Sequence, residues 1–216
     1  MKLYSYWRSS CAFRVRIVLN LKGLSYEYCA VNIHASSSHQ QSDEYGAVNP
    51  MRQVPTLEWE EAGKVVRLTQ SVAIAEYIEE HVPAPPLLPA APLVRARVRE
   101  AVEIVNSGVQ PLQNTNVLGE FARLEGDAGA RRWAANVMTK GLHALEVRAK
   151  LHAGKFLVGD ALSLADVFLI PQMYNARRAG VDVTQFPRLI DIEAQALSLE
   201  AFAKAVPEAQ PDAVAS

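Results

Sequence analysis

Five prolines lie within the twelve residues 81–92, HVPAPPLLPAAP, and they separate two parts of the chain with different patterns. Proline has no amide hydrogen to donate, and its ring clashes with the preceding helical turn. A run this dense therefore continues neither a helix nor a sheet, and we interpret it as a linker. The sequence predicts a first domain over residues 1–82, a linker over 83–91 and a second domain over 92–216.

The first part changes repeatedly between strand and helix patterns. Residues 11–22 carry an apolar stripe of helical period that ends before Gly23, and a second helix begins at residues 70–71. A polar segment over residues 34–43 has neither pattern and is expected to be a loop. Four short segments, rich in aromatic or β-branched side chains, predict strands: residues 2–6, 26–32, 56–59 and 65–68. The order β-α-β-loop-β-β-α predicts a small mixed sheet with helices packed against it.

The second part contains no convincing strand pattern and is dominated by Ala, Leu, Arg and Glu. Ser163 and Asp166 have the spacing of a capping box, which marks a helix start. The final ten residues, PEAQPDAVAS, are polar and contain proline, so we expect a frayed end. The predicted helices are residues 92–122, 129–151, 163–179, 187–196 and 199–206. The fold class predicted for the whole chain is an α/β domain followed by an all-α domain.

Composition excludes several classes of protein. The 216 residues include 22 Lys+Arg and 23 Asp+Glu, so there is no broad basic field for nucleic acid or for a membrane surface. The two cysteines form no C-x-x-C pair and the five histidines have no metal-ligand spacing, so we predict neither a disulfide scaffold nor a metal site. The first residues lack the apolar core of a signal peptide, and no stretch is long and apolar enough for a membrane span. A soluble, cytoplasmic protein is expected.

The densest chemical signal is Ser9-Ser10-Cys11, where the first strand turns into the first helix. Free backbone amides and the positive end of the helix dipole gather at such a junction. A hydroxyl there can donate to an anion, and a thiol there ionises more easily. On spacing alone, an ordinary serine N-cap and a small buried cysteine explain the same residues.

A second signal combines Gln53-Val54-Pro55-Thr56 ahead of a strand with Gln70-Ser71 at a helix start. A Val-Pro bond at this position can be cis, and the backbone of Val54 would then face outwards to pair with an extended peptide. Ser71 and the amides that follow it could bind a carboxylate. A turn followed by an N-cap is the simpler explanation of each piece alone.

In this order, with a helical domain attached, the sequence resembles the glutathione transferase superfamily. Within it, the sequence is most similar to the zeta class, which includes maleylacetoacetate isomerase and, more distantly, maleylpyruvate isomerase. The SSC-x-x-RVRI run is specific to that class, whereas QVPTL and the Gln-Ser pair belong to the wider superfamily. The matching stretches are YWRSSCAFRVRIVLNLKGLSYEY, NPMRQVPTL, TQSVAIAEYIEE, PPLLP, VQPLQNTNVL and LADVFLIPQMYNARR.

The resemblance implies a thioredoxin-like first domain with a cis peptide at Pro55, a helical second domain, a homodimer and glutathione as cofactor. It places the glutathione thiol beside Ser9, Ser10 and Cys11, with Ser9 as the activating hydroxyl. It also implies that Arg8 and Arg178 face the carboxylates of an acidic substrate. The other residues implied to bind glutathione are Gln40, Val54, Gln70, Ser71, Gln110, Asn114, Thr115 and Asn116.

The activity implied by the resemblance is glutathione-dependent cis–trans isomerisation of maleylacetoacetate to fumarylacetoacetate, in the breakdown of tyrosine and phenylalanine. Maleylpyruvate isomerisation is an alternative, although Asn116 stands where a basic residue is expected in those enzymes. A zeta-like transferase or dehalogenase acting on α-halo acids would use the same Ser9 site. A regulatory binding protein on this fold is the non-enzymatic alternative, and an intact Ser9, Gln70 and Ser71 argue against it.

Overall fold

The computed structural model describes residues 1–34 and 37–214, which form two compact units. The first unit combines Met1–Pro85 with the residues from Leu199 onward, and the second is Pro86–Ser198. All strands of the four-stranded sheet lie in the first unit, whereas helices build the second. This confirms the predicted fold class. Within the described residues, no helix combines the length and the apolar character that a membrane crossing requires.

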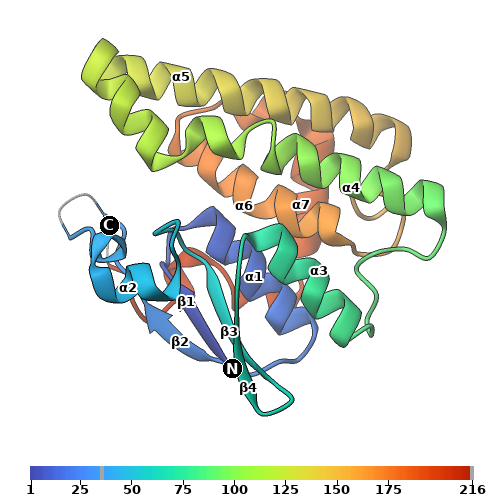
Figure 1. Cartoon of the computed structure of the whole chain (residues 1–216). Coiled ribbons are helices and arrows are strands. Elements are labelled where there is room, and N and C mark those ends of the chain that lie inside the picture. The colour runs from blue at the N-terminus through green and yellow to red at the C-terminus, as the bar shows by residue number, and fades with distance from the viewer. Residues whose placement is uncertain (35–36, 215–216) are drawn as a thin grey trace. The chain divides into compact units, whose positions relative to one another are not determined.

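The sheet of the first unit has the strand order β2-β1-β3-β4 (Figure 1). Its strands are β1 (Lys2–Ser5), β2 (Glu27–Ala30), β3 (Thr56–Glu61) and β4 (Lys64–Thr69). Helix α1 (Ser10–Leu21) connects β1 to β2, and these two strands are parallel, as a helical crossover requires. A tight turn with positive φ at Ala62 and Gly63 joins the antiparallel pair β3 and β4.

Helices α1 and α3 (Ser71–His81) pack side by side (Figure 1). Apolar side chains at helical spacing explain this packing, because Ile17 and Val18 of α1 and Ile74 and Ile78 of α3 are all fully buried. The two helices also begin near one another, because Arg14 of α1 lies 3.1 Å from Ser71, the first residue of α3.

The polar segment that was expected to be a loop over residues 34–43 is partly helical. It contains a short 3₁₀ helix, η1 (His39–Gln41), and leads into α2 (Asp43–Val48). The Ser42 hydroxyl caps α2 by accepting the Tyr45 amide at 3.1 Å, and the Tyr45 side chain is buried. The prediction failed because six residues around one buried tyrosine produce too short a periodic pattern to recognise.

The residues from Leu199 to Val214 group with the first unit, whereas the sequence predicts a helical domain over 92–216. Helix α8 (Glu200–Ala203) and a 3₁₀ turn, η4 (Pro207–Ala209), follow Leu199. Asn20 Nδ2 donates to the Ala201 carbonyl at 2.9 Å, and the buried Arg16 donates through Nε to the Ala205 carbonyl at 3.0 Å.

The end of the chain is also not frayed as predicted, up to the last described residue, Val214. The Asp212 carboxylate accepts the Trp7 amide at 3.1 Å and the Tyr28 hydroxyl at 2.6 Å. Pro207 and Gln210 are buried. A polar composition misled the prediction because these polar groups have partners in the first unit.

The second unit is organised around α6 (Leu164–Arg178), which packs against α4 (Pro92–Asn106), α5 (Thr115–His152) and α7 (Pro187–Leu197). Most of α6 is buried, including Phe168, Ile170 and Met173. The predicted capping box is present: the Ser163 hydroxyl accepts the Ala165 amide, and the Asp166 carboxylate accepts the Ser163 amide.

The predicted helix over residues 92–122 is not continuous. Helix α4 ends at Asn106, a 3₁₀ helix η2 (Gln110–Gln113) follows, and α5 begins at Thr115. The chain turns so tightly at Gly108 that a Cβ there would lie 2.6 Å from the Ile104 carbonyl oxygen. Pro111 also cannot donate within a helix. The interruption between residues 122 and 129 that the sequence predicted corresponds to Gly126, which has a φ of 71° inside α5.

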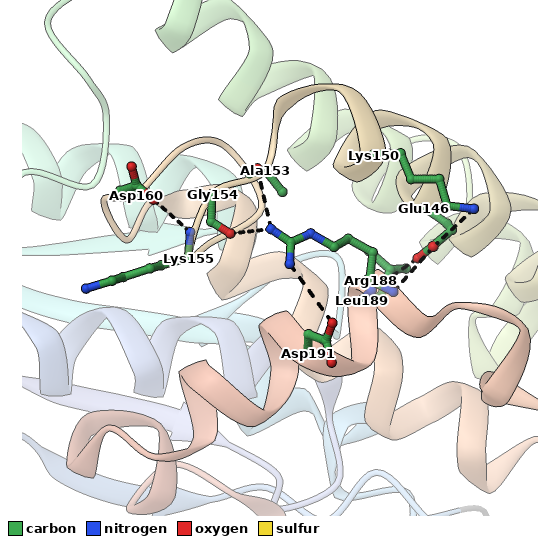
Figure 2. A network of polar contacts seen from close by, with 9 residues as sticks. All are labelled: Glu146, Lys150, Ala153, Gly154, Lys155, Asp160, Arg188, Leu189 and Asp191. Atoms are coloured by element: carbon green, nitrogen blue, oxygen red, sulfur yellow. Dashed lines mark hydrogen bonds and ion pairs between the residues drawn. The ribbon is translucent and has the colours of Figure 1, made fainter.

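A polar network centred on the buried Glu146 joins α5, the loop after it and α7 within the second unit (Figure 2). The Glu146 carboxylate accepts the amides of Arg188 and Leu189, at 3.3 and 3.1 Å, at the start of α7. The Arg188 guanidinium donates to the carbonyls of Ala153 and Gly154. Because these charges satisfy backbone groups, we assign them a structural role.

Candidate functional site

The start of α1 holds the Ser-Ser-Cys run. Ser9 is the N-cap, and its half-buried hydroxyl accepts the Ala12 amide at 3.2 Å. Ser10 is buried and Cys11 is a half-buried free thiol. Capping uses only the acceptor capacity of the Ser9 oxygen, so its hydrogen remains available for donation to an anion. The N-cap explanation and the anion-donor explanation are therefore compatible.

A buried arginine that sequence reasoning did not assign connects this start to the start of α3. Arg14 is fully buried, and its Nη1 lies 3.7 Å from Cys11 Sγ and 3.1 Å from Ser71 Oγ. The two sequence signals thus meet around one guanidinium. The arginine of the SSC-x-x-R run was the available signal, but nothing in a linear pattern indicates which residues it reaches.

Gln70 precedes α3 in a strained conformation, with a φ of 70° and a ψ of 116°. Such a conformation costs a non-glycine residue on the order of 1–3 kcal/mol and concentrates at ligand-binding positions. The Gln70 side chain makes no capping hydrogen bond to α3. The next residue, Ser71, is buried, so a hydroxyl and the positive end of a helix dipole lie together.

The Val54–Pro55 peptide bond is cis, as the resemblance implied. The carbonyl of Gln53, just before it, accepts hydrogen bonds from the Tyr45 hydroxyl at 2.8 Å and from Asn49 Nδ2 at 2.7 Å. Among the described residues, no hydrogen bond involves the Val54 amide or carbonyl. The backbone of Val54 can therefore pair with an extended peptide.

Gln40 lies in η1, and its Oε1 is buried with no hydrogen-bond partner among the described residues. Buried acceptors in native proteins are almost always satisfied. An unsatisfied amide oxygen in this position fits a ligand that brings an N–H donor, such as a peptide.

Arg8 lies beside a cavity of about 400 Å³ that is formed entirely by residues of the first unit. Its guanidinium stacks over the Trp7 ring, 4.7 Å from the ring centroid, and approaches the Tyr6 hydroxyl at 3.5 Å. The volume is within the range of small-molecule sites. The residues that line the cavity are Tyr6, Trp7, Arg8, Ala30, Asn32, His34, His39, Asp212 and Val214.

The charges around this cavity favour a small acid. Arg8 brings a guanidinium to the lining, and the rings of His34 and His39 bring nitrogen atoms that can hydrogen-bond. The one carboxylate of the lining, Asp212, already accepts two hydrogen bonds within the protein. His39 lines the cavity, and the next residue, Gln40, carries the amide oxygen that has no hydrogen-bond partner among the described residues. One short segment therefore contributes to both features.

The remaining predicted site residues lie in the second unit. Gln110 opens η2, Asn114 is the N-cap of α5, and Thr115 and Asn116 are exposed at the first turn. Arg178, the last residue of α6, is exposed, and its Nη1 is 3.5 Å from Asn175 Oδ1.

A pair of buried amides, missed by sequence reasoning, holds the η2 segment against α6. Gln113 Nε2 donates to Gln172 Oε1 at 2.9 Å, and Gln172 Nε2 donates back to Gln113 Oε1 at 3.1 Å. Gln113 Nε2 also lies 3.2 Å from Gln110 Oε1, and Trp133 Nε1 donates to the Leu112 carbonyl at 2.9 Å. The segment that carries Gln110 is therefore fixed from two sides.

No group of three or more His, Cys, Asp or Glu side chains in residues 1–34 and 37–214 is arranged to hold a metal ion. The chemistry available at the start of α1 therefore comes from hydroxyls, a thiol, helix amides and arginine.

Comparisons with known proteins identify the family to which the chain belongs. A family model described as the glutathione S-transferase N-terminal domain matches residues 1–80. The chain is 44% identical over 212 residues to a maleylacetoacetate isomerase of Dictyostelium discoideum, an alignment that covers 98% of this chain and 95% of that protein.

Two solved structures extend the similarity to the whole chain. The maleylacetoacetate isomerase of Anaeromyxobacter dehalogenans 2CP-1, with dicarboxyethyl glutathione and citrate in its active site, is 46% identical with a TM-score of 0.89, covering 99% of this chain and 97% of that one. A holo maleyl pyruvate isomerase, described as a bacterial zeta-class glutathione S-transferase, is 38% identical with a TM-score of 0.93, covering 99% and 100%.

Proposed function

We propose that this chain, which belongs to the zeta class of glutathione transferases and is a glutathione-dependent isomerase, converts maleylacetoacetate to fumarylacetoacetate. The observation that carries the proposal is the meeting of the α1 and α3 starts around Arg14, with Ser9 and Cys11 on one side and Ser71 on the other. This reaction belongs to the breakdown of tyrosine and phenylalanine.

The residues of the first unit fit glutathione. The backbone of Val54 suits pairing with its peptide groups, and the unsatisfied Gln40 Oε1 suits one of its N–H donors. Gln70 and Ser71, at the positive end of α3, suit its γ-glutamyl carboxylate. In the second unit, the family resemblance alone assigns Gln110, Asn114, Thr115 and Asn116 to glutathione binding.

Ser9 is the residue we assign to thiol activation, together with the α1 dipole. A free thiol with a pKa of about 8.5 is only a few per cent ionised at neutral pH. Lowering that pKa by ~2 units requires ~2.7 kcal/mol of preferential stabilisation of the anion. A hydroxyl hydrogen bond to the thiolate provides roughly 1.5–3 kcal/mol, and the helix dipole adds up to ~1 kcal/mol. Donation from Ser9 and the α1 start therefore suffices.

When bound, glutathione would supply a thiolate that adds to the substrate double bond as an enolate forms, and that is expelled unchanged when the double bond re-forms after rotation. The protein's part is to hold the substrate carboxylates while that bond turns. Arg8 and Arg178 suit this role, because a planar guanidinium binds a carboxylate through two hydrogen bonds. The cavity beside Arg8 supports a small acidic substrate.

Maleylpyruvate is the second candidate substrate, favoured by the 38% identity to a maleyl pyruvate isomerase. Asn116 favours maleylacetoacetate, because it replaces the basic residue expected in maleylpyruvate isomerases. We also propose a homodimeric, cytoplasmic enzyme. Two free thiols suit a reducing compartment, and the family resemblance supports the dimer.

The test is isomerisation by the purified protein with and without glutathione, on maleylacetoacetate, maleylpyruvate and dichloroacetate in parallel. We expect fast turnover of maleylacetoacetate that requires glutathione and returns it unchanged. Faster turnover of maleylpyruvate would reassign the substrate, and conversion of dichloroacetate alone would indicate a dehalogenating transferase. Light scattering on the same sample measures the oligomeric state.

A further inference from the structure

Two fully buried arginines lie on the same helix, α1, and their partners differ in kind. Arg16 donates to the Ala205 carbonyl at 3.0 Å, the Trp7 carbonyl at 3.0 Å and Ser5 Oγ at 3.2 Å. These hydrogen bonds hold Ala205, near the C-terminus, and the end of β1 against α1. Arg14 instead approaches Cys11 Sγ and Ser71 Oγ, the side chains that begin α1 and α3. Arg16 therefore serves the fold, and Arg14 faces the site.

The contact with Arg14 determines how Ser71 can act. A guanidinium nitrogen can only donate, so the Ser71 oxygen accepts this bond and its hydroxyl hydrogen must point elsewhere. Ser71 is buried at the first position of α3, where the helix dipole favours an anion. Arg14 thus leaves Ser71 as a donor at a place suited to a carboxylate.

The second contact fixes the guanidinium itself. Cys11 and Arg14 are three residues apart on α1, so they share one face of the helix. Nη1, the same atom that donates to Ser71 Oγ, lies 3.7 Å from Cys11 Sγ.

We propose that Arg14 is a positioning residue for glutathione: it orients the Ser71 hydroxyl towards the γ-glutamyl carboxylate and joins that end of the site to the thiol end at Cys11. The inference rests on the proposed function, because it assigns Ser71 to glutathione. It adds a residue that touches no ligand itself and acts through Ser71.

The test is a double-mutant cycle on glutathione affinity, measured by calorimetry with the full chain. We expect Arg14→Gln and Ser71→Ala each to weaken glutathione binding about 10-fold, and the double variant to be no weaker than either single one. S-methylglutathione, which has no thiol to ionise, should show the same loss, because the loss comes from the carboxylate end. Additive losses would overturn the inference.

Arg16→Gln is the matched control, since it removes an equally buried arginine from the same helix. It should lower the melting temperature as Arg14→Gln does and leave glutathione affinity unchanged; an equal loss of affinity in both would make Arg14 merely structural. If Arg14→Gln does not fold, Arg14→Lys takes its place in the double-mutant cycle. The losses of glutathione affinity in Arg14→Lys and Ser71→Ala should again be non-additive. Absence of binding by the unmodified protein would refute the proposed function. Normal binding with an unaffected Arg14 variant would refute this inference alone.

Discussion

At the scale of single residues, the Ser9 hydroxyl shows how one side chain supports both the fold and the chemistry. Its oxygen caps α1 by accepting the Ala12 amide, while its hydrogen is free for an anion. The sequence presented these as competing explanations of the same serine. The coordinates show that both are possible at once, because a hydroxyl accepts and donates in different directions.

Replacing Ser9 with alanine should therefore have two separable effects. Loss of the cap should lower stability by about 1 kcal/mol. Loss of the donor should raise the pKa of the bound glutathione thiol by about 1–2 units and reduce turnover at neutral pH. Thiolate absorbance against pH measures the second effect. Ser9→Thr, which keeps the hydroxyl, should preserve both properties, and an unchanged thiol pKa in Ser9→Ala would remove Ser9 from its assigned role.

Arg178 and its neighbour Arg177 provide a second residue-scale comparison. Arg177 forms a two-point ion pair with Glu193 of α7, whereas Arg178 is exposed and has only a long contact to Asn175. We expect Arg178→Ala to raise the KM for the dicarboxylic substrate about 10–100-fold with little change in glutathione affinity. Arg177→Ala should lower stability and leave that KM unchanged. Equal loss of both affinities in Arg178→Ala would make this arginine structural.

At the scale of elements, the start of α6 depends on a buried acid. Asp166 accepts the amides of Leu157 and Ser163 and the Ser163 hydroxyl. Burial raises the pKa of Asp166 to about 6, although these hydrogen bonds lower it in part. The native state therefore binds the proton more tightly than the unfolded state does.

This raised pKa predicts how stability changes with pH. The contribution of Asp166 is fully present below its unfolded pKa, near 4, and is lost as pH rises through about 6. Between pH 5 and pH 7 we expect a loss of about 1 kcal/mol from this group. Urea unfolding of the unmodified chain and of Asp166→Asn, at pH 5 and at pH 7, measures the contribution of Asp166 to the free energy of unfolding. The free-energy difference between the two proteins should shrink as pH rises, and a constant difference would contradict the assignment.

The side-chain amides of Gln113 and Gln172 link η2 to α6 through two hydrogen bonds. Gln172→Ala would leave the buried Gln113 amide without its two main hydrogen bonds. We expect a loss of about 1–3 kcal/mol in the free energy of unfolding. The double variant Gln113→Leu/Gln172→Leu should lose less unfolding free energy than the single variants Gln113→Leu and Gln172→Leu lose together. The reason is that neither amide then remains buried without a partner. Additive losses would show that the two amides do not act as a pair.

At the scale of the molecule, residues far apart in the sequence meet within the first unit. Asp212 accepts hydrogen bonds from Trp7 and Tyr28, and Asp212 and Val214 line the cavity beside Arg8. We expect Asp212→Ala to cost about 1–3 kcal/mol, because two donors lose their acceptor. Chemical denaturation measures it. Glu200→Ala, which breaks only an exposed ion pair with Lys204, should cost far less. A similar cost for both would mean that the tail is not anchored through Asp212.

The sequence by itself determined what depends on local pattern and on the type of residue. The proline run, the strand and helix periods, the Ser163 cap and the Ser-Ser-Cys junction are all short-range features, and steric and capping preferences act within a few residues. The fold class followed from their order, and the family followed from the resemblance of particular stretches such as SSC-x-x-RVRI. The break of α5 at Gly126 was visible in the same way, as an interruption of the helical period.

Only the tertiary structure decided which distant groups meet. Arg14 reaching Ser71, Gln113 reaching Gln172 and Asp212 reaching Trp7 each join residues more than fifty positions apart in the chain. A buried donor needs an acceptor, but the sequence does not say which of many will be near it. The packing of α1 against α3 selected that partner, and it turned a buried arginine into the link between the two helix starts that carry the candidate site.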